Sequence, residues 1–501
     1  MYTIFLPYVD AEQIKGTIDN LKATGESIDI ILVATSTDAK PYEDYKLLVC
    51  PDGLTATSTL KALAKAAEES DGDIVFYYTK LNTLLPGYNG LQRFDQVLTE
   101  TGSVMVYADY YSVKADGKLE RYPVIDLQEG ALRDDFNFGS LLCYDKDAFI
   151  ELVDGLKEDY KAAGLYDLRL AIMREGEIMH IGEFLYTDIE TDSRKSGEKI
   201  FDYVDPRNRA SQIEMEKACT EHLKLIGAWL SPEKESIDFG EEQFPVEASV
   251  IIPVRNRVRT IRDAVDSVLM QKAPFKFNVI VVDNHSTDGT TEALQEYKDD
   301  ERVIHVIPDR DDLGIGGCWN YGAARPECGK FTLQLDSDDL YSDDNVIKRI
   351  VDEFYRQNCA MLIGSYMLTD INKNQLPPGV IDHREWTDDN GANNALRING
   401  LGAPRCFYTP VLREYKLPNT SYGEDYALGL QISRTFRIGR IYDVLYLCRR
   451  WEDNSDAALD VDKMNAHNRY KDSIRTQELY ARIIENDVDD SCIVEIEGTK
   501  E

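Results

Sequence analysis

The sequence predicts an α/β protein with two domains, each a mostly parallel central sheet flanked by helices. Apolar runs of strand length alternate with helix-patterned segments in both halves of the 501-residue chain. A polar, acidic stretch punctuated by Pro and Gly, residues 231–248, separates the halves. The second strand regions of the halves align without a gap, DIILVATSTD at 29–38 and VIVVDNHSTD at 279–288. This match predicts an internal duplication of one fold.

In the second half, predicted strands are followed by predicted helices throughout. The strands are 249–254, 278–283, 302–307 and 331–335. Because unbroken apolar strands are typical of parallel sheets covered on both faces, we expect ligands to bind beyond their carboxyl ends.

The first half begins in the same way, with an apolar strand ending at Pro7, where the second half has Pro253. Ile14, Ile18 and Leu21 then follow at helical spacing. The predicted organisation is therefore an accessory domain, a linker, a catalytic domain and a C-terminal helix with an acidic tail. Their boundaries are 1–225, 226–247, 248–460 and 461–501.

Composition excludes some partners. The chain has 56 Lys and Arg against 90 Asp and Glu, and no basic run stands out, so nucleic acid and anionic membranes are poor partners. A negatively charged substrate would need a metal ion or a few placed arginines. Nine cysteines without a C-x-x-C pair indicate reduced thiols and a cytoplasmic protein, and no apolar stretch has transmembrane length.

An acidic cluster follows the strand at 331–335. In TLQLDSDDLYSDD, residues 332–344, Asp336 and Asp338 form an Asp-x-Asp pair. Two carboxylates at a strand end suit a hard divalent ion with positions left open for phosphate oxygens. The alternative is a solvated acidic turn, which is the interpretation we favour for Asp343 and Asp344.

Another carboxylate, Asp283, ends the strand at 278–283. It could accept a base N–H or a ribose hydroxyl. The following Ser286, Thr287 and Asp288 could instead make this a capping and turn cluster.

Five motifs in order resemble those of a family 2 glycosyltransferase with the GT-A fold. They are SVIIPVRNR, VIVVDNHSTDGT, GIGGCWNYGA, LQLDSDD and YGEDYALGL, between residues 248 and about 455. The resemblance implies inverting transfer of a sugar from a nucleotide-diphosphate donor, a UDP-sugar by default, with Mn²⁺ or Mg²⁺. It also implies a nucleotide pocket lined by Pro253, Arg255, Asn256 and Asp283. Asp336 would face the ribose and the metal, and Asp338 would be the principal metal ligand.

Asp425 in YGEDYALGL matches the family's catalytic carboxylate. An inverting transfer needs one base that takes the proton of the acceptor hydroxyl. Alternatively, Glu424 and Asp425 simply begin a helix, where acids favour the positive end of the dipole. Glu424 is also a candidate for acceptor contact.

Further candidates lie around these motifs. Arg450 could approach the diphosphate, Trp451 could stack on an acceptor sugar, and Asn320 could lie near the donor sugar. Leu447 replaces the Gln of the Gln-x-x-Arg-Trp motif of processive members, which argues against a processive synthase. Whether His467 completes the metal site stays open.

The first domain lacks the equivalent acids. Val33 aligns with Asp283, and no Asp or Glu occurs between Asp73 and Asp95. Gly164 and Leu165 replace the Glu-Asp pair. We therefore predict an accessory domain that holds the acceptor, orients the active domain or mediates self-association. A sugar-binding role is also open, with these candidates: Asp109, Tyr110, Asp134 and Asp135.

Two other functions remain as alternatives to a glycosyltransferase acting on a saccharide or other hydroxyl acceptor. One is a non-catalytic protein that binds sugars or nucleotide sugars. The other is a metal-dependent nucleotidyltransferase, which would want a Gly-rich basic loop after the first strand. Here that strand leads into PVRNRVR, which contains no glycine.

Overall fold

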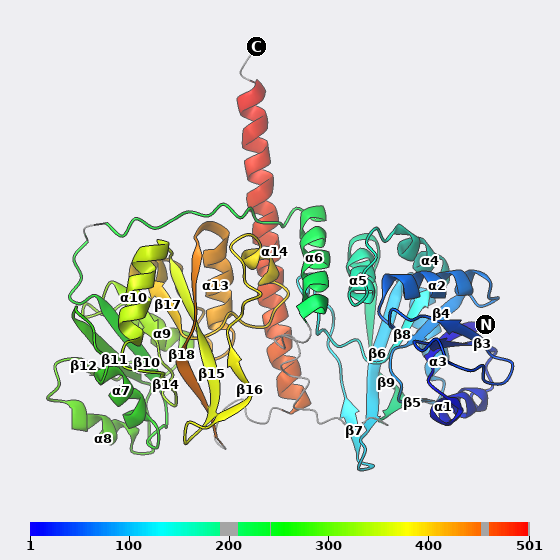
Figure 1. The fold of residues 1–501 in the computed structure, drawn as a ribbon, viewed down its shortest axis with the longest axis horizontal. Helices are drawn as coiled ribbons and strands as arrows, with labels where there is room; N and C mark the ends of the chain where they lie inside the picture. The colour runs from blue at the N-terminus through cyan, green and yellow to red at the C-terminus, as the bar shows by residue number, and fades with distance from the viewer. Residues whose placement is uncertain (191–208, 241, 452–459, 499–501) are drawn as a thin grey trace. The chain divides into compact units, whose positions relative to one another are not determined.

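A computed structural model describes residues 1–190, 209–240, 242–451 and 460–498 (Figure 1). The chain forms two compact units, Met1–Trp229 with Asp460–Glu501, and Leu230–Leu459. Their division lies within the segment predicted as a linker. Helix α14 (Val461–Gly498) belongs to the first unit, although the sequence predicted a place for it outside both domains.

The first unit is built on a nine-stranded sheet in the order β3-β2-β1-β4-β8-β6-β9-β5, with β7 paired to β6. Its strands are β1 (Tyr2–Pro7), β2 (Ile28–Ala34), β3 (Lys46–Val49), β4 (Ile74–Tyr78), β5 (Thr83–Pro86), β6 (Met105–Val113), β7 (Leu119–Tyr122), β8 (Leu141–Asp145) and β9 (Ile178–Ile189). Its other helices are α1 (Ala11–Ala23), α2 (Thr57–Glu68), α3 (Gly90–Thr101), α4 (Lys146–Gly155), α5 (Gly164–Glu175) and α6 (Arg209–Leu225).

The second unit repeats this order as β12-β11-β10-β13-β17-β15-β18-β14, with β16 paired to β15. Its strands are β10 (Ala248–Val254), β11 (Phe277–Asp283), β12 (Val303–Val306), β13 (Phe331–Gln334), β14 (Leu340–Tyr341), β15 (Met361–Asp370), β16 (Gln375–Ile381), β17 (Arg405–Tyr408) and β18 (Ile438–Arg450). Its helices are α7 (Ile261–Leu269), α8 (Thr290–Leu294) with a 3₁₀ turn (Gln295–Tyr297), α9 (Ile315–Ala323), α10 (Val346–Gln357), α11 (Gly391–Asn394), α12 (Thr409–Tyr415) and α13 (Glu424–Thr435).

The predicted α/β class and two-domain architecture are confirmed, but the sheets are mixed rather than mostly parallel. In the second unit β10, β11, β12 and β13 pair in parallel, as their apolar sequences predicted. Strand β17 then runs antiparallel between β13 and β15. The sequence did not reveal this reversal, because a buried antiparallel strand carries the same apolar pattern as a parallel one.

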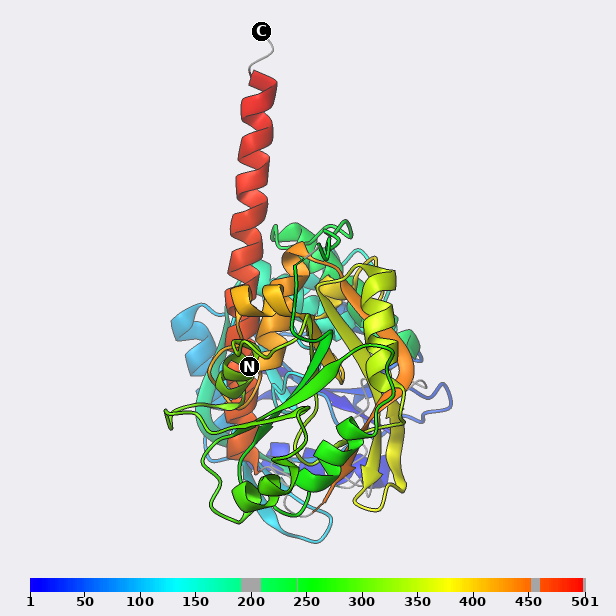
Figure 2. The same cartoon turned by 90° about the vertical axis from the view of Figure 1, so that its left-hand side faces the viewer.

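Each sheet is covered by amphipathic helices. Five apolar side chains of α10 are buried: Val346, Ile347, Ile350, Val351 and Phe354. This helix lies along β15 and β18, as Figures 1 and 2 show. Helix α9 contacts β10 and β11, and α12 and α13 contact α9. Strands β10 and β11 are thus covered by α9, which α12 and α13 support in turn.

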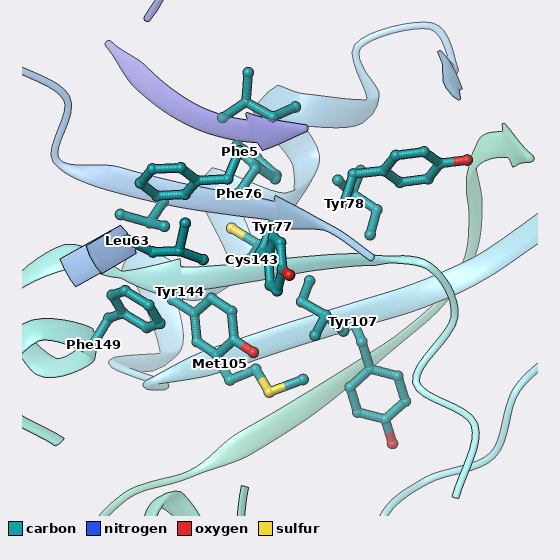
Figure 3. Close-up of a cluster of buried hydrophobic side chains, with 14 of the residues drawn as sticks. Phe5, Leu63, Phe76, Tyr77, Tyr78, Met105, Tyr107, Cys143, Tyr144 and Phe149 are labelled. Atoms are coloured by element: carbon teal, nitrogen blue, oxygen red, sulfur yellow. The ribbon is translucent and has the colours of Figure 1, made fainter. Parts of the chain in front are cut away.

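The core of the first unit is rich in aromatic residues (Figure 3). Phe76 makes edge-on contacts with Tyr2 and Phe94, at centroid distances of 5.5 and 5.8 Å. Its β-strands therefore bury large rings on their interior positions. No helix within the described residues of either unit is both long and apolar enough to cross a membrane.

Strand registers relate the two sheets residue by residue. Pro7 pairs with Val33, whereas Pro253 pairs with the residue before Asp283. The position of Asp283 is therefore taken by Ala34, one residue after the Val33 that the sequence alignment suggested. The error arose because the turn between this strand and Ser-Thr-Asp is one residue shorter in the first unit.

The same registers identify the first-unit residues at the positions of the acidic turn. Ile74 of β4 and Phe331 of β13 pair with equivalent residues of β1 and β10. Counting onward, the counterparts of Asp336, Asp338 and Asp339 are Thr79, Leu81 and Asn82. Lys80, which lies in the same turn, forms an ion pair of 3.0 Å with the buried Asp188. None of these three positions in the first unit carries an acid.

Candidate active site

The turn after β13 carries the acidic cluster. The backbone N–H of Asp336 donates to the Tyr446 hydroxyl at 3.0 Å, and its carboxylate accepts from Gln334 Nε2 at 3.1 Å. The neighbouring Asp339 accepts the backbone N–H of Arg449 at 2.7 Å. Strands β13 and β18 therefore fix the backbone and two of the carboxylates of this turn.

Like charges in a buried turn disfavour ionisation. Burial raises the pKa of Asp336, while the Arg405 guanidinium lowers it and the Asp338 carboxylate raises it. Burial, followed by the charges of Asp336 and Asp338, raises the pKa of Asp339 well above its usual value. A cation placed between these groups would remove the repulsion.

Asp336 and Asp338 fit a hard divalent ion by their donor chemistry. Carboxylate oxygens are the ligands that Mg²⁺ and Mn²⁺ take in proteins, together with water and phosphate oxygens. Among the described residues, no group of three or more His, Cys, Asp or Glu side chains could hold a metal ion. The protein itself thus offers these two carboxylates, and the remaining ligands would come from substrate and water.

Asp338 also faces cationic and aromatic groups. Its Oδ2 lies 3.6 Å from Arg257 Nε and 3.4 Å from Trp451 Nε1. The Arg259 guanidinium lies over the Trp451 ring, 4.9 Å from its centroid. The residue predicted to stack on an acceptor sugar therefore lies beside the acidic turn.

The loops after β10 and β11 are bonded to each other. Asn256, in a left-handed conformation with φ of 55°, donates its N–H to Ser286 Oγ at 2.9 Å. Its side-chain oxygen accepts the N–H of Thr287 at 2.8 Å. The N–H of Arg257 donates to Thr290 Oγ1 at 2.8 Å. These bonds fix the shape of the surface expected to receive a nucleotide.

Asp283 is completely buried at the end of β11. Its Oδ1 accepts the N–H of Ser286 at 3.0 Å, and its Oδ2 accepts from Thr291 Oγ1 at 2.5 Å and faces His305 Nε2 at 3.4 Å. Burial opposes ionisation, but these hydrogen bonds outweigh it and lower the pKa of Asp283. In this conformation the carboxylate stabilises the turn, as the capping alternative describes.

Asp425 is the second residue of α13 and pairs with an arginine that the sequence did not single out. Arg405 Nε lies 2.8 Å from Asp425 Oδ2. The adjacent Glu424 has a buried Oε2 atom without a hydrogen-bond partner. Burial, with a contribution from the Asp425 charge, raises the pKa of Glu424 to about 8. Two neighbouring carboxyl groups therefore have different environments.

The other predicted residues occupy varied positions. Pro253 is half-buried within β10, and Arg255 is exposed just after it. Asn320 exchanges hydrogen bonds of 2.7 and 3.0 Å with the backbone of Leu417, which indicates a structural role for its amide. Arg450 ends β18 and is half-buried. His467 lies on α14, in the other compact unit from the acidic turn.

Sequence reasoning missed three residues of this site: Arg405, Gln334 and Tyr446. Gln334 connects the other groups, because its Oε1 accepts the Arg405 backbone N–H at 3.0 Å while its Nε2 donates to Asp336. Gln334 and Tyr446 lie in apolar strand segments that resembled ordinary core, and Arg405 begins the short strand β17. A polar residue inside such a run was the available signal, and it is a weak one.

Sequence comparison assigns a family to this region. The profile of the glycosyl transferase family 2 matches residues 249–413. The teichuronic acid biosynthesis glycosyltransferase TuaG of Bacillus subtilis (strain 168) is 30% identical over 189 residues, which cover 37% of this chain and 71% of TuaG. The poly(ribitol-phosphate) beta-glucosyltransferase of Bacillus spizizenii is 24% identical over 213 residues, 41% of this chain and 33% of that protein.

Solved structures give a weaker likeness. The chain has 21% identity and a TM-score of 0.35 to S. aureus TarS residues 1–349 in complex with UDP, covering 41% of this chain and 60% of that one. No conclusion about this chain follows from a score of that size.

Proposed function

The chain belongs to glycosyl transferase family 2, and on this basis we propose that its second unit transfers a sugar from a nucleotide-diphosphate donor to an acceptor hydroxyl. The proposed donor is a UDP-sugar. The proposed acceptor is a saccharide or glycoconjugate, consistent with relatives named for teichuronic acid and poly(ribitol-phosphate). The proposed transfer is inverting and non-processive.

The connection between the acidic turn and the Asp425 pair carries this proposal. Arg405 contacts Asp425 through its side chain and Gln334 through its backbone, and Gln334 contacts Asp336. A donor-side carboxylate and a candidate base are therefore linked through two paired strands, β13 and β17. This proximity is what a transferase needs and what a simple acidic turn does not explain.

Asp336 and Asp338 would hold the metal ion. When bound, a divalent ion supplies positive charge that neutralises the diphosphate leaving group. In the protein itself, Asp338 also has Arg257 beside it, which adds a second positive charge near the phosphates. The loop bonds of Asn256 and Thr290 would orient the nucleoside.

Asp283 has a restricted part in this scheme. Both of its oxygens already accept hydrogen bonds, and its side chain is inaccessible. To accept the uracil N–H it would first have to become accessible, because the side chain is completely buried. We therefore propose that Asp283 acts first by shaping the turn, and contacts the base only after a local rearrangement.

The proton acceptor in this scheme is Asp425. As the acceptor oxygen bonds to the anomeric carbon, the bond from that carbon to the diphosphate oxygen breaks, and its electron pair leaves with the nucleoside diphosphate. The hydroxyl proton passes to the Asp425 carboxylate. One base of this kind is sufficient for inversion.

The first unit is proposed to be accessory. Thr79, Leu81 and Asn82 stand where the acidic turn would be, and Ala34 where Asp283 would be. Of its sugar-binding candidates, Asp109 is engaged with His180 at 3.0 Å, and Asp135 pairs with Arg133 at 2.8 Å. These pairs favour a structural role over direct sugar contact. Self-association through this unit remains part of the proposal.

Family membership argues against the two alternatives. A non-catalytic sugar-binding protein would not need carboxylates at Asp338 and Asp425. A nucleotidyltransferase would release pyrophosphate, whereas a sugar transferase releases a nucleoside diphosphate. Product identity therefore distinguishes all three.

The decisive experiment measures donor hydrolysis by the full chain across a panel of nucleotide sugars, with and without Mn²⁺. We expect turnover of a UDP-sugar that depends on the metal. Asp338→Asn and Asp425→Asn should each lower turnover by about a hundredfold or more. Unchanged turnover in both variants would refute the assignment.

Asp344→Asn is the matched control. This acid lies near the turn but is only half-buried, and it pairs with Lys272 at 2.5 Å. Turnover of this variant should equal that of the wild type. A loss as large as that of Asp338→Asn would mean that the local negative charge, and not a specific ligand, matters.

A further inference from the structure

We propose that Arg405 is a positioning residue that selects Asp425, rather than the adjacent Glu424, as the proton acceptor of the site. This inference rests on the proposed function. It adds a residue that none of the sequence motifs contains. It also predicts different roles for two neighbouring acids.

Arg405 is fixed from three directions. Its Nε contacts Asp425 Oδ2 at 2.8 Å, its Nη1 donates to the Gly402 carbonyl at 2.9 Å, and its backbone N–H donates to Gln334 Oε1 at 3.0 Å. The ion pair holds one oxygen of Asp425, Oδ2, and the other, Oδ1, is the oxygen that would receive the proton of an acceptor hydroxyl. The guanidinium therefore sets the direction of the carboxylate as well as its charge.

Glu424 lies in a different environment only one residue away. Its Oε2 is buried and has no hydrogen-bond partner. Close packing limits its movement, since a Cβ built on Gly316 would come within 3.1 Å of the Glu424 Cβ. Burial and the Asp425 charge raise its pKa. A carboxyl group with an unsatisfied oxygen in a buried place is more stable protonated, and it is then a hydrogen-bond donor.

The charged groups around Arg405 support this division. Burial alone would disfavour the guanidinium, but Asp425, Asp336 and Glu424, in that order, raise the pKa of Arg405. Tyr446 of β18 makes a smaller contribution that also raises the pKa of Arg405. Arg405 is one cation among three acids, and the ion pair that it forms, at 2.8 Å, is with Asp425.

The pairing has a consequence for the reaction. The acceptor oxygen bonds to the anomeric carbon as its O–H bond breaks, the proton bonds to the Asp425 carboxylate, and the electron pair of the donor C–O bond leaves on the diphosphate. Arg405 neither gains nor loses a proton. It holds the Asp425 carboxylate in place through the 2.8 Å ion pair, while Glu424 takes no part in the proton transfer.

The test compares pH profiles of kcat/KM for UDP-sugar hydrolysis by the full-length wild type, Arg405→Gln and Arg405→Lys, with Mn²⁺. In Arg405→Gln we expect the acid limb to move about one pH unit or more to higher pH, because the carboxylate loses the cation that stabilises its charge. In Arg405→Lys the acid limb of the pH profile should stay at its wild-type pH, while kcat falls. A Gln variant that loses only kcat, with an unshifted limb, would overturn the proposal.

Two further variants complete the comparison. Glu424→Gln resembles the protonated acid and should retain at least about a tenth of the activity, whereas Asp425→Asn should not. Equal losses in these two would overturn the proposal.

Arg413→Gln is the matched control for the Arg405 variants, because this half-buried arginine of α12 donates to the backbone carbonyls of Ala323 and Arg325. Its pH profile should be unshifted.

A readout independent of activity separates this inference from the proposed function. Carboxyl ¹³C NMR of the full chain should show a signal that titrates near pH 8 and disappears in Glu424→Gln. In Arg405→Gln this signal should change, and in Arg413→Gln it should not. If the wild type hydrolyses no donor, the proposed function fails. The NMR titration still decides whether Arg405 makes the two acids differ in protonation.

Discussion

At the scale of single residues, the two acids that begin α13 differ because only one has a close counter-ion. Asp425 has Arg405 at 2.8 Å, while Glu424 has a buried oxygen without a partner. Adjacent positions in a sequence thus receive different chemistry from one guanidinium that lies about twenty residues earlier in the chain.

This difference predicts a pH-dependent stability. A carboxyl with a raised pKa keeps its proton in the folded state at a pH where the unfolded chain has lost it. The wild type therefore loses stability as pH rises from about 4.5 towards about 8, by up to about 1.4 kcal/mol per pH unit from Glu424. Glu424→Gln should lack this loss. Its thermal midpoint relative to the wild type should rise between pH 5 and pH 8.

The control is Glu414→Gln, a change at an exposed acid of α12. Its midpoint relative to the wild type should not vary with pH over the same range. If the difference in thermal midpoint between Glu424→Gln and the wild type is also independent of pH, Glu424 is ionised at neutral pH in the folded protein.

At the scale of elements, the loops after β10 and β11 behave as one surface. The buried Thr290 hydroxyl accepts from the Arg257 N–H and donates to Asp288 Oδ1 at 2.5 Å. Thr290→Val keeps the shape and removes both bonds. We expect KM for the nucleotide sugar to rise up to about tenfold with little change in kcat, since one lost hydrogen bond is worth about 1 kcal/mol.

Steady-state kinetics with the donor identified from the panel provides the measurement. Thr409→Val is a suitable control. The hydroxyl of this buried threonine donates a hydrogen bond of 2.6 Å to the Gly329 carbonyl, which belongs to neither loop. A similar rise in KM for both variants would indicate general destabilisation instead of a shaped nucleotide surface.

Helix α14 is a second element with a clear energetic role. Asp472 is fully buried and accepts hydrogen bonds from Arg133 at 3.1 Å and Arg475 at 2.9 Å. Removing one member of a buried ion-pair network costs about 3–5 kcal/mol. Asp472→Asn should therefore lower the urea midpoint of the first unit markedly. Asp462→Asn, on an exposed position of the same helix, should leave it unchanged.

At the scale of the whole molecule, one strand order occurs twice, but the acidic turn occurs only once. The first unit has Thr79, Leu81 and Asn82 where the second has its acids. All metal-dependent turnover should therefore come from the second unit. The full chain with Asp338→Asn should show no residual Mn²⁺-dependent hydrolysis above about one percent of the wild type.

Any residual activity offers a further check. If metal-dependent turnover persists in Asp338→Asn and is lost when Lys80→Ala is added, the first unit is itself a transferase. The Lys80→Ala change alone should leave wild-type turnover intact, because Lys80 is paired with Asp188 and far along the chain from the acidic turn.

Sequence alone determined much of this description. Apolar runs located the strands that carry Asp283 and Asp336, because a buried strand must be continuously apolar and its end must not be. Ordered motifs identified the family. The absence of acids between Asp73 and Asp95 in the first half was also directly readable.

Only the tertiary structure decided which groups meet. It introduced Arg405 as the partner of Asp425, buried Asp283 among hydrogen bonds, and assigned α14 to the first unit. The mixed pairing of the sheets has the same origin. Side-chain contacts and strand direction depend on segments far apart in the chain, whereas periodicity reports only whether a position is buried. A half-buried arginine beside a carboxylate therefore leaves only a weak local signal in the sequence.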